Sequence, residues 1–123
     1  EYLYNKGKLI TDYGCYSLNS VDYPDFAHKL AESIEKNENE IGIQFCGTGN
    51  GINMSANKHQ GIRAALCHSS KGAELARLHN DANILVLAGR LIKKKEAVNC
   101  LGKFLSTQFE GGRHLRRVEK MDS

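Results

Sequence analysis

Cys46 has the sequence surroundings that most clearly predict chemistry. It ends an apolar run, "IGIQFC" (residues 41–46), and three of the five residues that follow, 47 to 51, are glycines. Glycines let backbone amides approach a ligand closely, and a helix that begins after such a loop presents its positive end there. Amides and a helix N-terminus stabilise a thiolate, the reactive form of cysteine. The alternative interpretation is a small apolar residue at the end of a buried strand.

The glycine-rich loop that follows Cys46 suits a negatively charged group. Its sequence, "GTGNG" (residues 47–51), has the glycine spacing G-x-G-x-G, which is not the dinucleotide-binding fingerprint. No Gly-Lys-Ser/Thr follows, so the loop is not a P-loop either. Two ligands remain open from the residues alone: a phosphate, or a sugar oxygen on which negative charge develops.

A second set of polar residues lies in the C-terminal half of the chain. His79 ends a predicted helix just before the last predicted strand, where a C-terminal cap is the alternative to a catalyst, and Asn80 suits a turn equally well. Arg90 follows that strand directly. Arg113 and Arg117 are four residues apart, so in a helix both guanidinium groups would lie on one face and could clamp a phosphate.

Composition and charge exclude several classes of protein. The chain has 123 residues, 41% of them hydrophobic, which suits a single domain spanning residues 1–123. The net charge is +3, and the excess of basic residues lies after Gly111. Positive charge gathered at one end of the chain favours a small anionic ligand over nucleic acid, with a solvated tail as the alternative. The sequence contains no apolar run of 18 residues, so it predicts no membrane span. The four cysteines form no CxxC pair and indicate reduced thiols in the cytoplasm. We find no metal-ligand cluster in the sequence.

Apolar segments alternate with helical patterns along the chain. Continuously apolar strands are typical of a parallel sheet with helices on both faces, which predicts an α/β fold, a three-layer α/β/α sandwich. In such a sheet ligands bind beyond the carboxyl ends of the strands. We expect strands at 8–14, 41–46, 62–67 and 83–89, and helices at 1–6 (its last turns), 22–39, 51–59, 69–81 and 93–109.

Four blocks of the sequence resemble the B-type ribose-5-phosphate isomerases. The blocks are "VDYPDFA", "CGTGNGINMSANKHQGIRAALC", "LARLHNDANILVLAGR" and "FEGGRHLRRV". They occur in the family's order over nearly the whole chain, so together they are far more specific than any single motif. The wider family also contains the galactose-6-phosphate and allose-6-phosphate isomerases.

The resemblance implies an activity and a role for each candidate residue. The family interconverts ribose 5-phosphate and ribulose 5-phosphate through an enediolate, without a metal or an organic cofactor. Cys46 falls on the family's base, Thr48 on a group that hydrogen-bonds substrate oxygens, and His79 on the group that opens the furanose ring. The implied substrate-binding positions are Gly47, Gly49, Asn50, Gly51, Asn80, Arg90, Arg113 and Arg117. The alternatives are a six-carbon sugar phosphate as substrate, or a non-catalytic sugar-phosphate-binding protein.

The resemblance also implies an assembly and a longer chain. In this family the active site is shared by two subunits, so Cys46 and His79 would come from different chains of a homodimer, with a tetramer as an open alternative. The Rossmann-like sheet would have about five strands, the first of which ends in an Asp-His pair. That strand is absent before Glu1, and roughly twenty residues would hold it. A chain that began at Glu1 is therefore expected to fold poorly.

Overall fold

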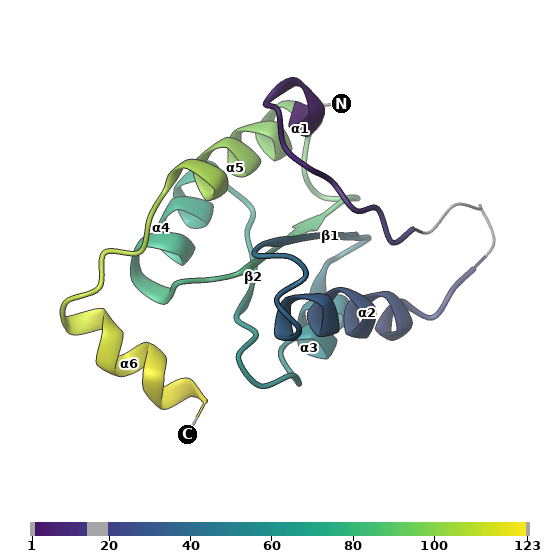
Figure 1. Cartoon of the computed structure of the whole chain (residues 1–123). Coiled ribbons are helices and arrows are strands. Elements are labelled where there is room, and N and C mark those ends of the chain that lie inside the picture. Colours follow the sequence, from purple (N-terminus) through teal and green to yellow (C-terminus); the bar gives the residue numbers. More distant parts are fainter. Residues whose placement is uncertain (1, 15–19, 123) are drawn as a thin grey trace.

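The computed structural model describes residues 2–14 and 20–122 of the chain. Helices and strands alternate along most of it, and helices pack against both faces of a small sheet (Figure 1). The elements are α1 (Tyr2–Asn5), α2 (Tyr23–Glu35), β1 (Gly42–Cys46), α3 (Asn50–Ala56), β2 (Ala64–Leu66), α4 (Ser70–Asn80), β3 (Ile84–Ala88), α5 (Lys94–Ser106) and α6 (Arg113–Met121).

The sheet is parallel, and β3 lies in its centre. The strand order is β1-β3-β2, with Cys46 of β1 paired with Ala88 at the end of β3. All five residues of β3 are buried, which confirms that this uninterrupted apolar run is covered on both faces. The carboxyl ends of the strands therefore meet at one edge of the sheet, and their amino ends at the opposite edge.

Two helical layers complete the predicted sandwich. On one face, α4 and α5 pack over Leu85 and Leu87 of β3, with Phe104 of α5 fully buried between them. On the other face, α2 and α3 cover Ile84 and Val86, the alternate residues of the same strand. Because successive side chains of a strand point to opposite faces, one short strand supplies both cores. The three-layer α/β/α fold is confirmed.

Local signals in the sequence correctly marked several helix ends. Proline 24 lies in the first turn of α2, where its missing N–H costs no hydrogen bond. The Ser69 hydroxyl accepts a hydrogen bond from the Gly72 amide (3.1 Å) and so caps α4. Gly7, with φ of +71°, follows the end of α1, as expected of a glycine stop.

The predicted strand at residues 8–14 is wrong. This segment pairs with no strand, and a cavity of about 940 Å³ separates it from β1. A strand exists only where a neighbour completes its hydrogen bonds, and here no neighbour in the described chain is close enough. Gln44 of β1 lines the same cavity, and its buried amide has no hydrogen-bond partner among the described residues. Within residues 2–14 and 20–122, the sheet thus has three strands and not the four that the sequence predicted there.

The described cysteines are free thiols, as the sequence predicted. Cys67 and Cys100 are buried in the core between the sheet and the α4–α5 layer, while Cys46 is half-buried. Burial raises the pKa of Cys67 from 9.0 to about 11, and it also raises the pKa of Cys100. Both are inert core residues at neutral pH. Cys15 lies outside the described residues. None of the helices that the structure describes is long and apolar enough to cross a membrane.

Candidate active site

The loop after β1 is shaped by packing as well as by its openness to a ligand. Gly49 is buried and has φ of +82°, and a Cβ there would lie 2.5 Å from the Leu66 side chain. A Cβ on Gly51 would overlap the ring of Tyr23. Gly49 is therefore required by its backbone conformation and its packing, whereas at Gly51 the half-exposed Tyr23 ring would have to move. The outer side of the loop stays open, with Thr48 and Asn50 exposed.

Arg90 lies against the same loop, at the carboxyl edge where the sequence predicted it. The Gly89 amide donates to the Cys46 carbonyl (2.7 Å), and the Arg90 amide donates to the Gly47 carbonyl (3.0 Å). The Arg90 side chain then passes over Gly47, so that a Cβ on Gly47 would lie 3.1 Å from the Arg90 Nε. In the described part of the chain no ion pair engages the exposed guanidinium of Arg90. It can bind an anion above the loop.

His79 is accompanied by two residues that the sequence analysis did not assign to the site. The rings of His79 and His114 are stacked, with centroids 4.3 Å apart and planes inclined by 17°. The Glu110 Oε2 atom lies 3.9 Å from the His79 Nε2 and 4.0 Å from the His114 Nε2. Burial lowers the pKa of His114, and the neighbouring His79 and Arg113 lower it further. Glu110 and His114 are close in the sequence, but Glu110 precedes α6, so no helical spacing marked this cluster.

These three side chains also form a group of potential metal ligands, which the sequence analysis did not find. Their donor atoms all lie within 4.8 Å of one another. A metal ion bound to an imidazole nitrogen lies in the plane of that ring, and two nearly parallel rings have no such point in common. As they lie, the two histidines do not converge on one ion.

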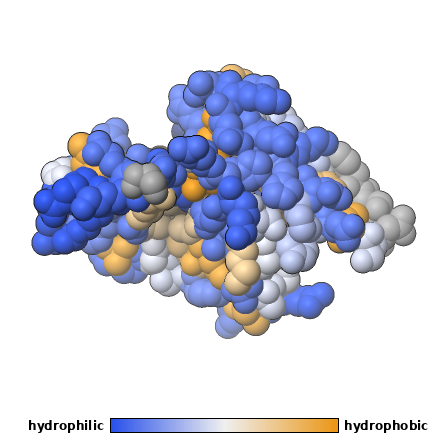
Figure 2. Space-filling model, turned by 90° about the horizontal axis from the view of Figure 1, so that it is seen from below, coloured by the Kyte–Doolittle hydropathy of each residue, from blue (hydrophilic) through white to orange (hydrophobic). Residues whose placement is uncertain are grey.

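Arginines 113 and 117 lie on a helix, which was the condition for a phosphate clamp. Both are exposed on α6, while His114 and Val118 of the same helix are buried. Figure 2 shows strongly hydrophilic surface gathered at the left-hand end of the molecule, where Figure 1 places α6. The positive charge near the C-terminus is therefore presented on an ordered helix and not on a solvated tail.

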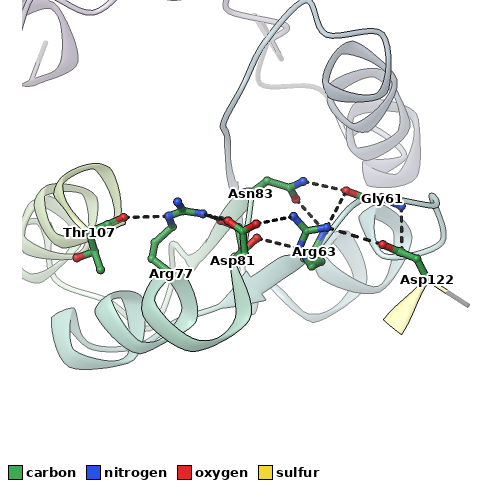
Figure 3. Close-up of polar contacts among 8 residues, drawn as sticks. Gly61, Arg63, Arg77, Asp81, Asn83, Thr107 and Asp122 are labelled. Atoms are coloured by element: carbon green, nitrogen blue, oxygen red, sulfur yellow. Dashed lines mark hydrogen bonds and ion pairs between the residues drawn. The ribbon is translucent and has the colours of Figure 1, made fainter. Parts of the chain in front are cut away.

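A polar network holds the ends of α4 and α6 in place (Figure 3). Arg77 donates to the Asp81 carboxylate (2.9 Å) and to the Thr107 carbonyl (3.2 Å). Arg63 contacts the other carboxylate oxygen of Asp81 at 3.3 Å and Asp122 at 3.8 Å. Asp81 is the left-handed residue that ends α4, two positions after His79. The network thereby holds the turn that carries His79, together with the end of α6.

The candidate residues divide into two groups at opposite edges of the sheet. Cys46 ends β1 at the carboxyl edge, whereas His79 precedes the start of β3 at the amino edge. A five-residue strand is roughly 17 Å long, so Cys46 and His79 of one chain cannot contact the same substrate carbon. We call the first group the cysteine half (Cys46, Gly47, Thr48, Gly49, Asn50, Gly51, Arg90) and the second the histidine half (His79, Asn80, Arg113, Arg117).

Comparison with known proteins decides the family. A profile described as Ribose/Galactose Isomerase matches residues 1–121, which is nearly the whole chain. The chain belongs to this family. It is therefore an isomerase, and the resemblance inferred from the four sequence blocks is confirmed.

Individual relatives agree in sequence and in structure. A protein of Mycoplasma pneumoniae named "Probable ribose-5-phosphate isomerase B" is 48% identical over 113 residues, which are 91% of this chain and 74% of that protein. A crystal structure of a ribose 5-phosphate isomerase from Thermotoga maritima is 55% identical, with a TM-score of 0.96 over 98% of this chain and 83% of that one. A Mycoplasma genitalium ribose-5-phosphate isomerase B with bound ribulose-5-phosphate is 43% identical, with a TM-score of 0.93 over 98% and 80% of the two chains.

Proposed function

We propose that this isomerase interconverts D-ribose 5-phosphate and D-ribulose 5-phosphate through an enediolate, in an active site shared by two copies of the chain. The relative from Mycoplasma genitalium, described with bound ribulose-5-phosphate, supports this substrate. The chemistry draws on protein groups alone, with neither a metal nor an organic cofactor.

The observation that carries the proposal is the separation of the two halves of the site. Neither half is sufficient alone: the cysteine half has a base and donors for an oxyanion, and the histidine half has an acid-base group and a phosphate clamp. A two-fold symmetric dimer brings the carboxyl edge of each copy to the amino edge of the other and so completes two sites at once. A tetramer would be a pair of such dimers.

Each residue then has a distinct chemical task. The Cys46 thiolate removes the proton from C2 of the open-chain aldose and returns it to C1. Thr48 and the amides of residues 47–51 hydrogen-bond the enediolate oxygens, where preorganised donors stabilise the developing negative charge. His79 of the other copy moves the proton that opens the furanose ring, since imidazole titrates near neutrality. Asn80 contacts the sugar.

The arginines supply binding energy remote from the reacting carbons. Arg113 and Arg117 lie on one helix of the histidine half, and Arg90 lies beside the loop of the cysteine half. Guanidinium groups bind phosphate through paired hydrogen bonds, and a phosphate held in this way keeps C1 and C2 beside Cys46.

Two alternatives remain as test outcomes. The matching family includes galactose isomerases, so a six-carbon sugar phosphate is the competing substrate. The resemblance favours the pentose, because galactose-6-phosphate isomerase subunits usually lack the "HND" (residues 79–81) and "GGRH" (residues 111–114) segments that are present here. Steady-state rates with ribose 5-phosphate, allose 6-phosphate and galactose 6-phosphate separate these cases. A protein that binds ribose 5-phosphate without forming a ketose would instead be a non-catalytic binder.

Subunit mixing tests the shared site directly. Cys46→Ala and His79→Asn should each abolish turnover of ribose 5-phosphate while the protein still binds a sugar phosphate. In a mixed dimer of the two variants, one site carries both changes and the other carries neither. Co-expression with two different affinity tags should therefore restore about a quarter of the wild-type activity in a statistical mixture. No recovery in purified mixed dimers would reject the shared site, and near-full turnover by Cys46→Ala would reject the base.

A further inference from the structure

The stacked pair of His79 and His114 is asymmetric. The His114 side chain is only 9% exposed, because α6 packs against α4 at this point, whereas the His79 side chain is 38% exposed. The two rings lie nearly parallel at 4.3 Å, which is contact distance for stacked aromatic rings. His114 is thus the buried member of the pair, and the more exposed ring of His79 packs against it.

Backbone contacts fix the position of His114 relative to the end of α4. The Glu110 amide donates to the carbonyl of Leu78, the residue directly before His79, at 3.0 Å. The His114 amide donates to the Gly111 carbonyl at 3.1 Å, which closes the turn between Glu110 and α6. The distance between the two histidines is therefore set by backbone hydrogen bonds and not by surface side chains alone.

The charges around the pair disfavour protonation of His114. Glu110 lies nearly equidistant from both Nε2 atoms, whereas Arg113 and Arg117 oppose a second positive charge on His114. His114 is also buried, so its neutral form is preferred. His114 is therefore the buried, uncharged partner of the pair, and His79 is the ring that faces solvent.

We propose that His114 is a positioning residue for ring opening: its buried imidazole stacks on His79 and holds that ring in the orientation from which it transfers a proton to the sugar-ring oxygen. This inference rests on the proposed function. It extends that function by assigning a role to a residue that does not itself contact the substrate. Stacking of this kind restricts rotation of the His79 ring about its side-chain bonds. Without this restriction, a partly exposed histidine would rotate out of alignment with the substrate.

Two reactions distinguish a misplaced His79 ring from a general loss of catalytic activity. Isomerisation of ribose 5-phosphate requires ring opening, because that sugar is mostly a closed furanose. Exchange of deuterium from D₂O into C1 of ribulose 5-phosphate requires only enediolate formation, because O5 of this ketose carries the phosphate and cannot close a furanose ring. The second reaction, followed by NMR, therefore depends on Cys46 and not on His79.

We expect His114→Ala to lower kcat for ribose 5-phosphate by about 10- to 100-fold, the loss typical of a catalytic group displaced by about 1 Å. Deuterium exchange should remain within about twofold of the wild type. His114→Phe keeps a flat ring at the stacking position and should recover most of the lost turnover. His68→Ala, a change at an exposed histidine outside the cluster, is the matched control and should alter neither reaction.

Three results would overturn the proposal: equal losses in both reactions, full turnover of ribose 5-phosphate by His114→Ala, or a His114→Phe variant as impaired as His114→Ala. His79→Asn should lose isomerisation of ribose 5-phosphate more completely than His114→Ala and should likewise retain deuterium exchange. A wild-type protein that catalyses neither reaction would reject the proposed function itself, which is a different outcome from equal losses in the variants. Thermal melts of each variant identify any change that acts through unfolding.

Discussion

Substituting alanine for Gly47 should impair substrate binding, and substituting alanine for Gly49 should impair stability, although the two positions are two residues apart in one loop. At Gly47, where φ is not positive, a Cβ would lie 3.1 to 3.2 Å from the Nε, Cδ and Cζ atoms of Arg90. That side chain is flexible and can move away by a few tenths of an ångström. At Gly49, with φ of +82°, a Cβ would lie 2.5 Å from Cδ1 of Leu66, which packs against the core, and 3.4 Å from Cγ1 of the buried Val86.

The expected magnitudes follow from these contacts. For Gly49→Ala, the left-handed backbone costs about 1–2 kcal/mol and overpacking about 1–3 kcal/mol, while the stiffer unfolded chain offsets about 0.4–1 kcal/mol. A net loss of about 2–4 kcal/mol should lower Tm by roughly 10 °C. For Gly47→Ala, the displaced Arg90 should raise KM for ribose 5-phosphate roughly 5- to 10-fold, which corresponds to about 1 kcal/mol.

Thermal melts and steady-state kinetics on the two variants, with the wild type beside them, decide the matter. The contacts predict a large change in Tm for Gly49→Ala alone and a change in KM with an almost constant Tm for Gly47→Ala. A Gly49→Ala protein that melts within about 2 °C of the wild type would refute the packing argument. An unchanged KM in Gly47→Ala would show that the position of Arg90 over this loop does not matter for substrate binding.

Two further predictions concern the core and the end of α6. Because the pKa of Cys67 is raised to about 11, the folded state keeps a proton that the unfolded chain releases near pH 9.0. This contribution to stability is present below pH 9 and is lost as the pH rises to about 11. The urea midpoint of Cys67→Val should therefore fall less between pH 9 and pH 11 than that of the wild type, and an equal fall in both proteins would contradict this. Asp122→Ala removes an acceptor for the Gly61 amide and a partly exposed partner of Arg63, so it should cost about 0.5 kcal/mol or less of stability. It should also raise KM severalfold, because the end of α6 is held less firmly. An unchanged KM would contradict this role of Asp122.

Local patterns in the sequence were sufficient for most of the fold. An uninterrupted apolar run predicted the buried strand β3, Pro24 and Ser69 marked helix starts, and the density of glycines after Cys46 marked the loop. These signals act within a few residues, because helix caps, turns and the burial of a strand depend on near neighbours. The four sequence blocks that contain many of these signals also showed the family resemblance, which the comparisons confirmed.

Contacts between distant segments were beyond the sequence patterns. Residues 8–14 have the composition of a strand, but no strand of residues 2–14 and 20–122 pairs with them, and pairing is a property of two segments. His79 meets Glu110 and His114 across about thirty residues, so no local spacing announced the stacked pair. The sequence by itself determined which side chains could do chemistry and on which elements they lie. Only the tertiary structure decided that Cys46 and His79 lie at opposite edges of one sheet, because the edge on which a residue falls depends on the direction in which packed strands run.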